Sequence, residues 1–81
     1  MNDLNENSND KYIGFYKHFK GKIYELKAIA INSETLEDYV VYQACYGERL
    51  LWIRSKRMFF EKLEFNEKIV SRFEYIGKSN P

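Results

Sequence analysis

The 81-residue sequence contains one cysteine, one histidine and one proline, which excludes several kinds of functional site at once. A single cysteine cannot form an internal disulfide, and Cys45 with His18 provides too few ligands for a tetrahedral zinc site. The four glycines are isolated from one another, so a glycine-rich phosphate loop is also excluded. We therefore expect no cofactor, no metal site and no catalytic residues, and an enzyme is the least favoured class.

The sequence also lacks a long apolar run and an excess of charge of one sign. No segment approaches the ~18 apolar residues that a membrane span needs, and the start MNDLNENSND does not resemble a signal peptide. The chain is therefore expected to be cytoplasmic, without a membrane partner. Thirteen Lys and Arg against twelve Asp and Glu leave a net charge of +1, so nucleic-acid binding would require a local basic patch.

Aromatic residues are abundant, with seven tyrosines, six phenylalanines and one tryptophan. A chain of this length buries only ~60% of its unfolded surface, so it forms one domain whose core depends on these large rings. Residues 1–10 are polar and are predicted to be a disordered tail. Residues 11–77 are predicted to form the domain, and residues 78–81 a frayed C-terminus.

Alternation of apolar and polar residues predicts strands through most of the chain. The longest signal is a hairpin over residues 22–46, in which Tyr39–Tyr46 is expected to be the central strand. A short helical turn is predicted at Lys56–Phe60. Side chains expected to share an inner face are Tyr24, Leu26, Ala28 and Ala30 in one strand, and Ile69, Phe73 and Tyr75 in the last one.

The segment Leu51–Arg54 is predicted to be a short strand with Leu51 and Ile53 on one face and Trp52 and Arg54 on the other. Together these segments predict a mainly β, single-domain antiparallel β-barrel of five to six short strands with at most one short helical turn.

An ordered series of short motifs resembles the bacterial domain-of-unknown-function family 1653 over roughly residues 12–77. The motifs are Tyr16-Lys17-His18-Phe19-Lys20-Gly21, Tyr24, Ala30, Ser33-Glu34-Thr35-Leu36-Glu37, Val40-Val41-Tyr42, Tyr46-Gly47, Trp52-Ile53-Arg54 and Met58-Phe59. Asn32, Cys45 and Ser55 stand where His, Leu and Pro are usual in this family. The resemblance implies a compact β-barrel with an SH3-like fold, and it implies no activity.

Two groups of residues are candidates for ligand binding. The polar run Ser33, Glu34, Thr35 and Glu37 could contact a ligand, although its side chains could equally satisfy the backbone of their own turn. The second group is Tyr42, Trp52 and Arg54. Its rings could form a peptide groove or fill the core, and Arg54 could instead pair with an acid of the polar run.

Two stretches without acidic residues could together form a basic surface if their strands share a face. This set comprises Tyr16, Lys17, His18, Lys20, Lys22, Trp52, Arg54, Lys56 and Arg57. Such a surface would suit base stacking and phosphate contacts. The sequence thus favours a non-enzymatic binding module for a peptide or small polar ligand, and the alternative is a nucleic-acid-binding domain. It does not identify the partner.

Overall fold

The structure is a computed structural model that describes residues 8–81. In chain order its elements are η1 (Ser8–Tyr12), β2 (Gly14–His18), β3 (Ile23–Ile31), β4 (Asp38–Ala44), β5 (Leu51–Ser55), α1 (Lys56–Phe59), β6 (Lys62–Phe65), β7 (Lys68–Ser71) and β8 (Phe73–Gly77). Residues 8–10, which the sequence assigned to the disordered tail, begin the 3-10 helix η1. The rest of that predicted tail lies outside the described residues.

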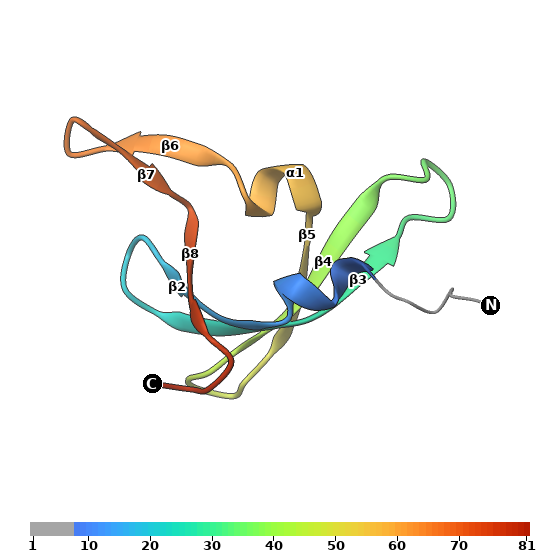
Figure 1. Cartoon of the computed structure of the whole chain (residues 1–81), viewed down its shortest axis with the longest axis horizontal. Coiled ribbons are helices and arrows are strands. Elements are labelled where there is room, and N and C mark those ends of the chain that lie inside the picture. The colour runs from blue at the N-terminus through green and yellow to red at the C-terminus, as the bar shows by residue number, and fades with distance from the viewer. Residues whose placement is uncertain (1–7) are drawn as a thin grey trace.

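Five of the strands form one antiparallel sheet in the order β5-β4-β3-β2-β8, and β6 pairs with β7 in a second sheet. Figure 1 shows the larger sheet curving beneath α1 and the β6–β7 hairpin. The prediction of a mainly β antiparallel fold is confirmed. The predicted closed barrel is not, because β5 and β8 lie at the two edges of the larger sheet and do not pair with each other.

The middle strand of this sheet is β3, whose pairing with β4 shifts register between Leu26 and Ala28. Tyr24 and Leu26 face the core as predicted, but the extra residue at the bulge turns the following side chains over. Ala28 and Ala30 are therefore exposed on the outer face. The prediction that all four residues share the inner face is wrong for the two alanines, and β4 is not the central strand.

The strands β4 and β5 form a hairpin with regular alternation, so Trp52 and Arg54 share one face and Leu51 and Ile53 the other, as predicted. Tyr42 pairs with Trp52 and Val40 pairs with Arg54, which places all four side chains on the concave inner face. On the outer face Ile53 is paired with Val41.

The core lies between the sheet and α1. Ser55 caps this helix, since its Oγ accepts a hydrogen bond from the Met58 N–H at 3.2 Å. The helix confirms the predicted turn and directs Phe59 into the sheet, where its ring stacks on Phe73 at a centroid distance of 4.1 Å. The buried cluster consists of Tyr16, Leu26, Val40, Tyr42, Phe59 and Phe73.

The last predicted strand, residues 69–76, is divided in the structure. The break falls at Arg72, where β7 leaves for the small sheet and β8 joins the edge of the large one. Phe73 is buried as predicted, but Ile69 is 70% exposed and Tyr75 is half-exposed, which corrects the expectation for those two side chains. Among residues 8–81, no helix has the length and hydropathy needed to cross a lipid bilayer.

Candidate functional site

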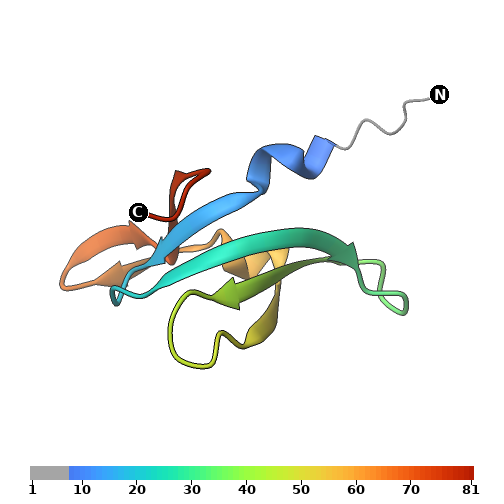
Figure 2. The same cartoon turned by 90° about the horizontal axis from the view of Figure 1, so that it is seen from below.

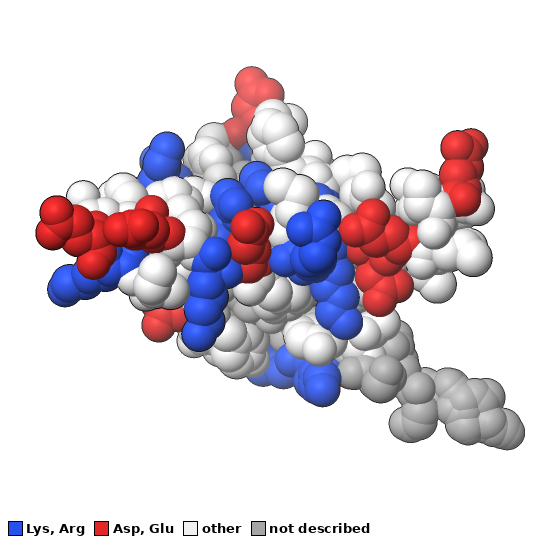
Figure 3. All heavy atoms as spheres, turned by 90° about the horizontal axis from the view of Figure 1, so that it is seen from above, with Lys and Arg blue, Asp and Glu red and all other residues white. Residues whose placement is uncertain are grey.

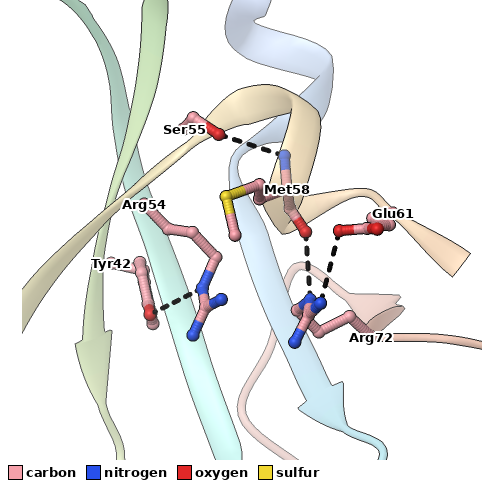
Figure 4. Close-up of polar contacts among 6 residues, drawn as sticks. All are labelled: Tyr42, Arg54, Ser55, Met58, Glu61 and Arg72. Atoms are coloured by element: carbon pink, nitrogen blue, oxygen red, sulfur yellow. Dashed lines mark hydrogen bonds and ion pairs between the residues drawn. The ribbon is translucent and has the colours of Figure 1, made fainter. Parts of the chain in front are cut away.

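The concave face of the sheet carries a guanidinium group surrounded by aromatic rings. The β4–β5 pairing directs Arg54 inward, where its Nε lies 3.5 Å from the Tyr42 hydroxyl and its Cζ lies 6.0 Å from the Phe73 ring centroid. The side chain is partly buried. Figure 4 shows the Arg54 guanidinium extending beneath α1, with Tyr42 beside it.

Arg54 has no carboxylate partner within the described chain. The ion pairs among residues 8–81 are Lys27–Glu25 at 3.2 Å and Arg72–Glu61 at 3.3 Å. The terminal nitrogens of Arg54 have no hydrogen-bond acceptor there either, and the contact with Tyr42 involves only Nε. The group can therefore accept a bidentate anionic ligand, the arrangement for which a guanidinium is best suited.

A neighbouring arginine has a different role. Arg72 donates from Nε to the Met58 carbonyl at 3.1 Å and from Nη2 to Glu61 at 3.3 Å, as Figure 4 shows. These bonds fasten the residue between β7 and β8 to the end of α1. The hydrogen bonds of Arg72 thus stabilise the fold, although its charge adds to the positive potential around Arg54.

Further tyrosine rings continue the aromatic wall of this face. Tyr24 packs edge-on against Tyr42 at 5.5 Å, and its hydroxyl lies 2.7 Å from that of Tyr46. Burial is the main cause that raises the pKa of Tyr24, and the hydrogen bond to Tyr46 adds to it. The Tyr24 hydroxyl therefore stays protonated at neutral pH. The Lys22 ammonium lies over the Tyr46 ring at 4.8 Å.

His18 completes the face from β2, with its ring 5.0 Å from that of Phe73. Burial lowers the pKa of His18 first of all, and the charges of Arg54, Arg72 and Lys20 lower it further. Its Nδ1 accepts a hydrogen bond from the Lys20 backbone N–H at 3.1 Å. The neutral imidazole therefore carries its proton on Nε2. That nitrogen can donate a hydrogen bond to a ligand, and the ring adds no charge to this face.

The comparisons with known proteins address the family of this chain and its fold. The sequence model of a family described as "Protein of unknown function (DUF1653)" matches residues 14–75. The chain belongs to the DUF1653 family. A crystal structure of a DUF1653 protein from Bordetella bronchiseptica superposes with a TM-score of 0.80 at 30% identity, covering 93% of this chain and 99% of that one. No curated protein matches the sequence.

In this DUF1653 chain the polar run at residues 33–37 forms a tight loop between β3 and β4. The Asn32 Oδ1 accepts hydrogen bonds from the backbone N–H groups of Glu34 at 2.9 Å and Thr35 at 3.3 Å. The Thr35 Oγ1 accepts from the N–H of Glu37 at 3.2 Å. Asn32 thus holds the loop together. Ser33, Glu34 and Glu37 remain exposed.

No hydrogen bond or ion pair joins Arg54 to the described acids of the loop. Of the ligand-binding residues predicted from the sequence, the structure groups Tyr42, Trp52 and Arg54 on the concave face of the DUF1653 fold. It places Ser33, Glu34, Thr35 and Glu37 in the loop that precedes β4.

The predicted basic set of this DUF1653 protein is distributed over several surfaces. Tyr16 is buried, and its hydroxyl donates to the Tyr12 carbonyl at 2.8 Å. Lys17 lies on the outer face, opposite to its neighbour His18. The other members are Lys20 over the Phe19 ring, Lys22 over Tyr46, and Lys56 and Arg57 on α1. On the face drawn in Figure 3, basic and acidic side chains alternate.

A hollow beside α1 was not anticipated from the sequence. It has a volume of about 640 Å³ and is lined by Tyr12, Glu37, Asp38, Lys56, Arg57 and Phe60. Tyr12 lies in η1, which the sequence did not predict, and this is why the pairing of its ring with Phe60 at 5.1 Å was missed. Two acids and two bases share the rim, so the hollow carries no dominant charge.

The described residues offer no arrangement for thiol or metal chemistry. Burial raises the pKa of Cys45, so its thiol is protonated at neutral pH, and no group of three His, Cys, Asp or Glu side chains among residues 8–81 could hold a metal ion. Arg49, Glu25 and Lys27 are the charges that act on the Cys45 thiol, and His18 is not among them.

Proposed function

We propose that this domain is a non-enzymatic binding module whose concave face binds the carboxylate of a peptide or of a small polar ligand. The observation that carries this proposal is the guanidinium of Arg54, which is partly buried among aromatic rings and has no acidic partner among residues 8–81. Removing a charged group from water is unfavourable unless something compensates for it. An incoming anion would provide that compensation.

The neighbouring side chains support a ligand that also has an apolar or aromatic part. Trp52 lies beside Arg54 on the same strand and is 47% exposed, so its ring offers a stacking surface at the edge of the site. The Nε2 proton of His18 and the tyrosine hydroxyls are donors that can bind additional ligand oxygens. The cytoplasmic location expected from the sequence is part of the same proposal.

The proposal can be tested with two probes that differ only in charge, N-acetylphenylalanine and its C-terminal amide. Binding is followed by the fluorescence of Trp52, the single tryptophan, and by NMR shifts of the backbone amides. A charged hydrogen bond contributes ~1.5–3 kcal/mol, so the carboxylate form should bind at least ~10-fold more tightly than the amide. Arg54→Ala should remove this difference.

Arg57→Ala serves as the matched control, because Arg57 is an exposed arginine on α1, outside the concave face. It should leave the affinity for both probes unchanged. Equal binding of acid and amide by the native protein, or full discrimination by Arg54→Ala, would overturn the proposal. Failure of the carboxylate probe to bind at ~20 mM would do the same, since such a site should reach millimolar affinity.

The nucleic-acid alternative rests on His18, Arg54 and Trp52, the members of the basic set that face the concave side. Tyr16 is buried, Lys22 lies over the Tyr46 ring at the margin of this face, and Lys17, Lys56 and Arg57 lie elsewhere. This distribution favours the peptide or small polar ligand over a phosphate backbone. Titration with single-stranded and double-stranded oligonucleotides at two salt concentrations separates these functions. Nucleic-acid affinity should fall steeply with salt, by a slope of ~0.7–0.9 for each phosphate contacted. Absence of binding at low salt excludes the alternative.

A further inference from the structure

The edge strand β5 is exposed and strongly apolar. It ends the larger sheet beyond β4, as Figure 2 shows. The four consecutive residues Leu50, Leu51, Trp52 and Ile53 are all exposed, and Ile53 reaches 67%. Soluble proteins usually protect such edges with lysine, proline or a bulge inside the strand, because an open edge can pair with another chain. None of these protects residues 50–53.

The phase of the hydrogen bonds shows which backbone groups of β5 are available for pairing. The Ala44 N–H donates to the Leu50 carbonyl at 3.0 Å, so these residues form a hydrogen-bonded pair in the β4–β5 ladder. Hydrogen-bonded pairs alternate along an antiparallel ladder, so Trp52 and Arg54 also direct their N–H and C=O groups toward β4. Leu51 and Ile53 direct theirs outward.

We propose that two copies of this protein pair through β5 in an antiparallel, two-fold symmetric dimer centred on Ile53. A two-fold axis perpendicular to the sheet requires that one residue face its own copy. Ile53 is the midpoint of Leu51–Ser55, and its backbone groups point outward, so this register overlaps the whole strand. Ile53 then exchanges two backbone hydrogen bonds with Ile53 of the partner subunit.

The side chains brought together in this register are complementary on both faces. On the inner face Trp52 lies opposite Arg54 of the partner subunit in a non-hydrogen-bonded pair, where Cα atoms are ~4.5 Å apart and side chains touch. An arginine over a tryptophan ring is a favourable cation–π pair. On the outer face the two Ile53 side chains meet. On each subunit Val41 of the neighbouring strand β4 continues this apolar surface toward the middle of the sheet.

The expected dimer is weak, because one strand of five residues is a small interface. A standard interface buries ~800 Å² on each partner, and smaller ones give transient complexes. We therefore expect a dissociation constant of about 1–100 μM. A second copy is favoured over an unrelated peptide because the strand is self-complementary, with a tryptophan and an arginine at equal distances from its midpoint.

Sedimentation velocity from ~2 μM to ~500 μM tests the dimer directly across this range. The native protein should shift from monomer to dimer, and Ile53→Lys should remain monomeric, because lysine at an edge opposes pairing. Ile69→Lys is the matched control: Ile69 is 70% exposed on β7, outside the proposed interface, so this variant should dimerise normally. A native protein that stays monomeric, or an Ile53→Lys variant that dimerises as well, would overturn the proposal.

Disulfide cross-linking tests the register in a Cys45→Ser background. With Ile53→Cys, the two Cα atoms should lie ~5.5 Å apart, within the ~4.4–6.8 Å that a disulfide spans. With Leu51→Cys, the two cysteines should be four residues out of register, ~14 Å apart. Oxidation should therefore give a covalent dimer for the first variant and not for the second. The reverse pattern, or no cross-link with either, would refute this register.

Discussion

Replacing Phe59 with alanine should remove most of the stability of this domain, because Phe59 is the one residue of α1 that is buried in the core. Its side chain has no exposed surface. Its ring contacts are Phe73 at 4.1 Å, Phe60 at 5.0 Å, Tyr42 at 5.2 Å and Tyr16 at 5.3 Å. These contacts join α1 to three strands of the sheet, so the loss would not be local.

The size of the effect follows from burial. Truncation of a fully buried phenylalanine to alanine costs ~3–5 kcal/mol, including the cavity that remains. A chain of this length is expected to be stable by ~4–12 kcal/mol, so the variant retains little of it. Since ~1 kcal/mol shifts the melting temperature of a small domain by ~4–8 °C, a fall of more than ~10 °C is expected.

Urea unfolding followed by far-UV circular dichroism, together with a thermal scan, measures the loss for Phe59→Ala. Met58→Ala is the control on the same helix, because Met58 is 38% exposed and should cost less than ~1 kcal/mol. If Phe59→Ala lost no more than Met58→Ala, α1 would not be packed against the sheet as described. The assignment of Phe59 and Phe73 as the centre of the core would then be wrong.

Two further predictions concern β2 and its neighbours. Gly14→Ala should lower the free energy of unfolding in urea more than Gly21→Ala does. Both glycines have a positive φ, at +147° and +112°. A Cβ at Gly14 would also lie 2.8 Å from the Gly77 carbonyl oxygen and from Tyr75 Cε1, whereas a Cβ at Gly21 would have nothing within 4 Å. Equal losses of unfolding free energy in the two variants would show that the steric contact of the added Cβ at Gly14 does not contribute. Burial lowers the pKa of His18 below 6.5, so the unfolded chain takes up the proton first on acidification and stability is lost as pH falls below 6.5. Between about pH 7.5 and about pH 5, the melting temperature of His18→Gln should therefore fall less than that of the native protein. An unchanged pH profile would contradict this prediction.

The strand pattern of this fold is largely encoded in local alternation, and it fails where the backbone departs from period two. The alternation of β4 and β5 follows directly from the sequence, which places Trp52 and Arg54 on one face, and the structure shows that this face is the inner one. The face of β3 does not follow from the sequence, because one bulge residue after Leu26 reverses the direction of all later side chains without a sequence signal such as glycine. The break between β7 and β8 is similar, since Arg72 fits the alternating pattern on both sides.

The candidate site is predictable only in part, for a related reason. Alternation places Trp52 and Arg54 together, because they belong to one strand. It does not show that Phe73, nineteen positions beyond Arg54, supplies the ring beneath the guanidinium, since that contact depends on how the sheet curves. Nor can it show whether an acid from the loop reaches Arg54. The structure leaves Arg54 without an acid among residues 8–81.

Ligand binding and β5 pairing should be thermodynamically linked, because Arg54 and Ile53 are neighbours on the same edge strand. In the proposed register Trp52 of the partner subunit lies opposite Arg54 and extends the aromatic wall of the site. The dimer should therefore bind N-acetylphenylalanine more tightly at each site than the monomer does, and saturating ligand, which fills both sites, must strengthen the dimer by the square of that factor. An extra ring contact of ~1 kcal/mol corresponds to about a fivefold change.

This linkage separates the two proposals experimentally. The affinity of the native protein for N-acetylphenylalanine should rise as the protein concentration crosses the dimer dissociation constant, while Ile53→Lys should show the lower, monomer affinity throughout. Ile53 faces the outer side of the sheet, so its substitution does not touch the ligand directly. If the native protein dimerises but its affinity does not depend on concentration, the ring of the partner subunit is not at the site. The Arg54 site would then function in each monomer alone.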